Sequence, residues 1–206
     1  TWMVPVRSKL DEEYRLEYLE GDIPLTPEVS LLEARKEIAK FGRLTHEMLH
    51  MVRELLTAKD QRIRDGLMDR IAKYEQITDR IEVEVGKYLT KTSTEVRNEE
   101  VSAEIQGMLG IIGDLERVGD IFFQMSKAME RKLTDRLWFT PEQRTNLLEM
   151  LDLLEQAFVV MHRNLDVEAG AVSLDEAVEA EQRINQKRDQ LRRAHLRSIE
   201  SGDYNV

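Results

Sequence analysis

The chain has 206 residues, a net charge of −10 and no cysteine. This length allows one domain or two small ones, and the acidic balance argues against nucleic acid or an anionic membrane surface as the main partner. The lack of cysteine excludes disulfides and thiolate metal sites, and without a run of 18 apolar residues we expect no membrane span within this sequence.

Five segments carry apolar residues at every third or fourth position, which is the period of an amphipathic helix. Charged residues make up 34% of the chain, and there are only four prolines and ten glycines, a composition typical of long-helix proteins. No alternating strand pattern persists, so the sequence predicts an all-α bundle with antiparallel neighbours. The expected helices span about residues 28–57, 60–90, 98–132, 141–166 and 173–200.

Local signals predict where some of these helices begin and end. Thr26 and Thr140 each place a capping hydroxyl before a proline at the first helical position. Ser173 and Glu176 form a capping box for the last helix. The polar stretch 91–97 predicts a loop after the second helix.

A shift of 106 residues superimposes the pattern of the first helix on the fourth and that of the second on the fifth. Phe41, for example, falls on Leu147. One shift that aligns two helices predicts a duplicated three-helix unit, in which the last helix of the second unit is missing. The expected divisions are residues 1–27 as an irregular leading segment, 28–132 as the first repeat and 133–206 as the incomplete second repeat.

Two pairs of acidic residues stand on neighbouring predicted helices. Glu75 and Asp79 are four residues apart, as are Glu116 and Asp120, so each pair lies on one face of its helix. Glu82 lies a further turn along. Inward-facing carboxylates on adjacent helices form metal sites in helical bundles, and iron, manganese and zinc all accept carboxylate ligands. The alternative is a solvated polar face without a metal.

The second repeat offers a weaker version of this pattern. The shift places Glu181 on the first acid of the Glu75 pair, but Asn185 stands where the second acid would be. An asparagine offers a carbonyl oxygen but no charge, so a complete second site is in doubt.

Histidines offer few further ligands. His46 and His50 are four residues apart but fall off the apolar stripe, and without a visible partner to hold their rings in orientation they are weak candidates for metal ligands. His162 and His195 are expected at the surface. No nucleophilic triad, glycine-rich phosphate loop or metalloprotease motif occurs, so we expect no enzyme.

The run D-L-E-R-V-G-D at residues 114–120 resembles the signature of PhoU, the bacterial phosphate-uptake regulator, and Glu75-x-x-x-Asp79 resembles its companion motif. The resemblance covers about residues 28–200. The stretches S-L-L-E-A-R-K-E-I-A, V-E-V-G-K-Y-L-T-K, F-Q-M-S-K-A-M-E-R-K and W-F-T-P-E-Q-R resemble in particular the cytosolic C-terminal PhoU-like domain of bacterial sodium/phosphate cotransporters.

This resemblance implies a non-catalytic domain that tunes phosphate uptake at the cytoplasmic face of the bacterial inner membrane. Its partner would be the transmembrane transport domain of the same protein, reached through residues 1–27 as a tether. No initiator Met leads the chain, which agrees with a fragment of a longer protein. The resemblance further implies iron, zinc or manganese as cofactor, with Glu75, Asp79, Glu116, Asp120 and Glu181 as candidate ligands.

Three alternatives remain open at this point. The chain could be a free-standing PhoU-type regulator of a phosphate ABC importer and its signalling. It could be a di-metal carboxylate oxidase, but that site needs a Glu-x-x-His motif on each of two helices, and only Glu47 and His50 supply one. It could also be a structural dimerisation bundle with solvated acids, and a homodimer is open in every case.

Overall fold

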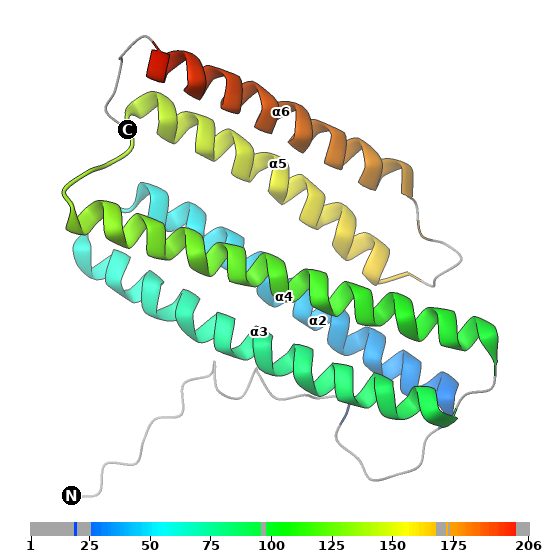
Figure 1. Ribbon diagram of the computed structural model, residues 1–206. Helices are drawn as coiled ribbons and strands as arrows, with labels where there is room; N and C mark the ends of the chain where they lie inside the picture. Colours follow the sequence, from blue (N-terminus) through cyan, green and yellow to red (C-terminus); the bar gives the residue numbers. More distant parts are fainter. Residues whose placement is uncertain (1–18, 20–25, 96–97, 168–171, 173, 201–206) are drawn as a thin grey trace, which may run out of the picture. The chain divides into compact units, whose positions relative to one another are not determined.

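The computed structural model describes residues 19, 26–95, 98–167, 172 and 174–200 (Figure 1). Within these residues there are five α-helices and no strand, so the predicted all-α class is confirmed. None of these helices has an apolar stretch long enough to cross a membrane. The helices are α2 (Pro27–Thr57), α3 (Gln61–Glu95), α4 (Glu99–Thr134), α5 (Pro141–Leu165) and α6 (Leu174–Glu200).

The helix starts follow the capping signals in the sequence. Thr140 caps α5 with a complete capping box, because its hydroxyl accepts a hydrogen bond from the Gln143 N–H and the Gln143 side chain accepts one from the Thr140 N–H. Asp60 Oδ1 accepts hydrogen bonds from the backbone N–H groups of Arg62 and Ile63 at 2.8 and 3.2 Å, which caps α3. The capping serine predicted for α6, Ser173, lies outside the described residues, as does most of the predicted tether.

The prediction of a loop at residues 91–97 is wrong for residues 91–95, because α3 continues through Glu95. Thr92 is buried, so the apolar face of α3 extends one turn beyond Leu89. Hydroxyl groups in this turn donate to carbonyl oxygens three or four residues earlier, as Thr92 Oγ1 does to Tyr88 at 3.0 Å. These hydrogen bonds give the hydroxyl groups partners within the helix, so a polar composition does not require a loop here.

Helix α4 ends in a left-handed residue. Arg136 has a φ of 56°, its N–H donates to the Leu133 carbonyl oxygen at 3.1 Å, and the next N–H, of Leu137, donates to Lys132 at 2.7 Å. This pair of bonds is the Schellman motif, in which glycine usually occupies the left-handed position.

The chain forms two compact units, and α2, α3 and α4 each contribute a segment to both. The first unit comprises Thr1–Thr45 and Ala72–Asp120. Arg35 Nε on α2 donates to Glu104 Oε1 on α4 at 2.8 Å, and Gly86 on α3 lies against Ile112 on α4. Its buried apolar side chains include Ile38, Phe41, Tyr74, Ile81, Val85, Leu89, Ile105 and Ile112.

The second unit comprises His46–Ile71 and Ile121–Val206. Helices α5 and α6 run antiparallel and side by side within it (Figure 1). Ion pairs Lys187–Glu149 and Arg163–Glu176 join these two helices. Its buried apolar side chains include Met48, Val52, Leu55, Leu56, Ile71, Phe122, Leu151 and Phe158.

Candidate functional site

The two predicted acid pairs lie in the same compact unit, on α3 and α4. Glu75, Glu116 and Asp120 are partly buried, whereas Asp79 is exposed. The carboxylate charges of the two helices act on one another, so the fold brings the pairs into one electrostatic cluster. Glu82, one turn beyond Asp79, belongs to the same cluster through its effect on Glu116.

Two members of this acid cluster hold their protons more tightly than a free glutamate does. Burial raises the pKa of Glu75, and the charges of Asp79, Asp120 and Glu116 raise it further. Burial also raises the pKa of Glu116, together with Glu82, Asp79 and Asp120, while Arg117 opposes them. Mutual repulsion among these carboxylates raises the two pKa values, and a nearby cation would oppose that repulsion.

The donor chemistry of the acid cluster fits a metal ion, since carboxylate oxygens suit hard cations and manganese, and also bind iron and zinc. The side chains do not gather around one point, however. No three of these acids place ligand oxygens within 4.8 Å of one another among the described residues. To bind one ion together, Glu75, Asp79, Glu116 and Asp120 would have to bring their carboxylates closer, so their role as ligands remains a prediction.

Glu181, the predicted counterpart in the second repeat, is exposed on α6. Asn185, in place of the second acid, donates from Nδ2 to Glu181 Oε1 at 3.4 Å and accepts from Arg188 at 2.9 Å. The asparagine is thus engaged in a hydrogen-bonded chain along the helix surface.

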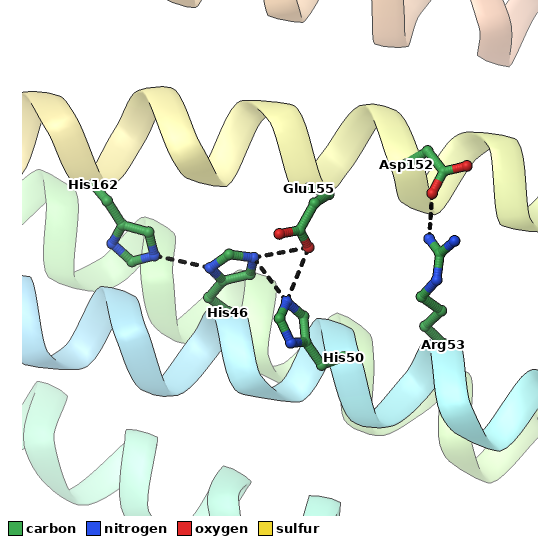
Figure 2. A network of polar contacts seen from close by, with 6 residues as sticks. All are labelled: His46, His50, Arg53, Asp152, Glu155 and His162. Carbon is green, nitrogen blue, oxygen red and sulfur yellow. Dashed lines mark hydrogen bonds and ion pairs between the residues drawn. The ribbon is translucent and has the colours of Figure 1, made fainter.

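A second polar cluster brings histidines of α2 together with α5 (Figure 2). His46 Nε2 and His50 Nε2 lie 3.1 Å apart, and each is 2.9 Å from Glu155 Oε2. His46 Nδ1 lies 3.0 Å from His162 Nε2. All four residues belong to the second compact unit. His46, His50 and Glu155 form the one group of three metal-binding side chains found close together in the described part of the chain.

The environment of this histidine cluster is partly apolar. The His46 ring stacks on the buried Phe158 ring, with centroids 4.7 Å apart and planes 3° from parallel. Burial by itself would raise the pKa of Glu155, but hydrogen bonds and charge from His46 and His50 outweigh it and hold that pKa below its ordinary value. Glu155 is therefore a carboxylate at neutral pH.

The sequence predicts only part of this histidine cluster. The spacing of His46 and His50 shows that they share a helix face, as predicted, and the exposure expected of His195 is confirmed. His162, also expected at the surface, is partly buried, and its Nε2 lies 3.0 Å from His46 Nδ1. Nothing in the sequence points to Glu155: the 106-residue shift places it on Leu49, so the repeat supplies no signal.

Comparison with known proteins finds a family model that matches part of the chain. Residues 38–129 match the family model of the PhoU domain. The curated proteins and the solved structures each gave no significant match. The matched segment begins in α2, contains all of α3 and ends in α4, and so lies within residues 28–132, the first predicted repeat.

The PhoU domain contains both acid pairs and also His46 and His50, while Glu155 and Glu181 follow it in the chain. The D-L-E-R-V-G-D run therefore lies inside the matched segment, as the resemblance implied.

Proposed function

We propose that this chain is a non-catalytic regulatory domain of a sodium-dependent phosphate transporter, and that it tunes phosphate uptake from the cytoplasmic face of the bacterial inner membrane. The observation that carries the proposal is the PhoU domain at residues 38–129, which contains both acid pairs in one compact unit. The four sequence stretches that resemble the cytosolic domain of sodium/phosphate cotransporters support the link to that kind of transporter.

The regulatory step is conformational. Glu75 and Glu116 hold repelling charges on two neighbouring helices, so a bound cation would favour a packing in which α3 and α4 approach each other more closely. A ligand shifts a conformational equilibrium only by its difference in affinity for the two packings. In this mechanism metal occupancy or contact with the transport domain supplies that difference, and the leading segment transmits it.

A free-standing PhoU-type regulator of an ABC importer is the second candidate. The PhoU domain supports both candidates equally, and only the four resembling stretches favour the cotransporter. The reading frame upstream of Thr1 separates them, because a frame that encodes several apolar 20-residue segments favours the cotransporter and a nearby start codon favours the free regulator.

Deletion of residues 28–206 from the full-length transporter tests the proposed role. Uptake of labelled phosphate would be measured over a range of external phosphate in cells that lack other importers. We expect transport to persist but its response to external phosphate to change. Equal uptake and an equal response in the deleted and intact proteins, at matched expression, would contradict the proposal.

Metal content tests the acid cluster separately. The purified chain would be compared with the variant Glu75→Ala/Asp79→Ala/Glu116→Ala/Asp120→Ala by elemental analysis for iron, zinc and manganese. We expect the parent to hold more metal per chain than the variant does. Equal metal content in the two proteins after incubation with excess ion would show that these acids bind no metal, and regulation would then rest on protein contacts alone.

A further inference from the structure

We propose that His46, His50 and Glu155 form a binding site for a divalent transition-metal ion, with Zn²⁺ as the ion that fits it best. This site is separate from the acid cluster in residues, in compact unit and in ligand chemistry. The inference does not depend on the proposed role in phosphate transport.

The spacing of the three ligand atoms matches a metal's coordination shell. His46 Nε2, His50 Nε2 and Glu155 Oε2 form a triangle with sides of 2.9, 2.9 and 3.1 Å. Bonds of about 2.0–2.1 Å in a tetrahedral zinc site place ligand atoms roughly 3.3 Å apart. An expansion of a few tenths of an ångström in each side would therefore seat the ion, without any change of backbone.

Hydrogen bonds alone cannot give all three of these atoms a favourable partner. If both imidazoles donate to Glu155 Oε2, their two N–H groups confront each other across 3.1 Å. If only one donates, the other imidazole turns a lone pair toward the carboxylate. A cation at the centre is attracted to all three atoms at once, which removes this conflict.

The surroundings prepare His46 to be a ligand. Its Nδ1 lies 3.0 Å from His162 Nε2, so an N–H on Nδ1 that donates to His162 leaves the lone pair on Nε2. Metal-bound histidines commonly hold their tautomer and ring orientation by such a bond from the other nitrogen. Stacking on Phe158 fixes the same ring from its face.

The remaining coordination position opens to solvent. His50 and Glu155 line a groove of about 640 Å³, whose wall also includes the Arg53–Asp152 ion pair (Figure 2). Two histidines and one carboxylate are three protein ligands, which leaves a fourth position for water or a small ligand. The same ligand set is found at non-haem iron centres, so ferrous ion is the competing occupant.

The experiment is a zinc titration of the metal-free 206-residue chain against a chromophoric chelator, followed by Co²⁺ substitution. We expect one equivalent of Zn²⁺ to bind at these three ligands, separate from any ion in the acid cluster, and the Co²⁺ form to show the intense visible absorption of a tetrahedral site. His50→Gln and Glu155→Gln should each abolish this equivalent. His162→Gln should retain the stoichiometry but weaken binding about 10- to 100-fold.

Matched controls separate this site from other ligands. His195→Gln removes an exposed histidine on α6, and Asp152→Asn removes an exposed acid of the same groove, so both should bind Zn²⁺ as the parent does. The double variant Glu75→Gln/Glu116→Gln, in the acid cluster, should also retain this equivalent. Circular dichroism of each metal-free variant verifies that it is folded, and the two ligand variants lie at positions exposed enough to tolerate glutamine.

Three results would overturn the proposal. These are a parent that binds no Zn²⁺ at micromolar concentration, equal binding by the parent and His50→Gln, and loss of the equivalent only in the acid-cluster variant. Octahedral Co²⁺ absorption, with tighter binding of ferrous ion than of zinc under anaerobic conditions, would overturn the choice of zinc.

Discussion

At the scale of single residues, burial among like charges determines the properties of the acid cluster. Glu75 lies partly buried one turn from Asp79 and within the field of Glu116 and Asp120. A carboxylate in such a place costs stability when it is ionised, and a cation or a proton relieves that cost. The residues that would bind a metal are therefore the residues that strain the metal-free fold.

Glu75→Gln should raise the free energy of unfolding at pH 7. The folded-state pKa of Glu75 is raised, so the stability linked to its protonation is complete below its unfolded pKa and is lost as pH rises through the folded value. Glutamine keeps the uncharged form at every pH. The gain should be at least that of one removed i,i+4 like-charge pair, about 0.2–0.5 kcal/mol, and should vanish near pH 3.

Urea denaturation of the metal-free proteins at pH 7 and pH 3, followed by far-ultraviolet circular dichroism, measures this difference. Glu47→Gln is a suitable control, because Glu47 is exposed on α2 outside the acid cluster. A loss of stability in Glu75→Gln at pH 7 would show that attractive contacts, not repulsion, dominate at Glu75.

At the scale of the helices, one helix end and one exposed helix face carry residues that destabilise the fold relative to other amino acids. Arg136 occupies the left-handed position after α4, where a side chain is strained. Gly110 lies in the exposed middle of α4, where a glycine costs backbone entropy. Each position therefore allows a stabilising substitution with a defined physical cause.

Arg136→Gly should raise the free energy of unfolding by about 0.5–1 kcal/mol, because glycine adopts a positive φ without the Cβ clash. Thermal and urea unfolding of parent and variant would measure it. Thr134→Gly, at the last helical residue of α4, is the control and should lower stability, since glycine there weakens a helix. Equal destabilisation by both substitutions would contradict the role assigned to the φ of Arg136.

Gly110→Ala should stabilise the chain by about 0.5–1 kcal/mol, because, apart from its chain neighbours and the nearby helix backbone, no heavy atom lies within 4 Å of the position that the new Cβ would occupy. The urea midpoint, with an unchanged slope, reports the gain. A decrease in the midpoint would indicate that this face of α4 is covered in solution, since an added methyl group can destabilise only where a neighbour approaches it.

At the scale of the whole molecule, α2, α3 and α4 run without a break from one compact unit into the other. Neither unit can unfold completely without disrupting helices that the other also uses. Because a broken helix must be nucleated again at a cost, partial unfolding at these points is disfavoured.

We therefore expect a single cooperative unfolding transition. Calorimetry of the metal-free chain should give equal calorimetric and van't Hoff enthalpies. Phe41→Ala, at a fully buried position of the first unit, should lower the free energy of unfolding by the roughly 3–5 kcal/mol typical of such a truncation, and so lower the midpoint temperature of that one transition. Two separate transitions, only one of which shifts in Phe41→Ala, would show that the units unfold independently.

Much of this molecule follows from the sequence by itself, because the decisive signals are local. Apolar spacing predicts each of the five helices, and Thr26 and Thr140 mark the starts of α2 and α5, because the first turn of a helix is satisfied by residues adjacent in the chain. The polar turn 91–95 misleads, since its hydroxyls bond back to the helix. The D-L-E-R-V-G-D run indicates PhoU, and the matching domain contains it.

Only the tertiary structure brings Glu155 and His162 to His46 and His50, because α5 meets α2 across more than a hundred intervening residues. A helix period specifies which side chains share a face but not which residue of another helix stands opposite, since that depends on packing of the apolar stripes. The same packing sets the burial of Glu75 and Glu116, and so their raised pKa values. Ligand types and spacing within one helix are properties of the sequence, whereas convergence of ligands from two helices is a property of the fold.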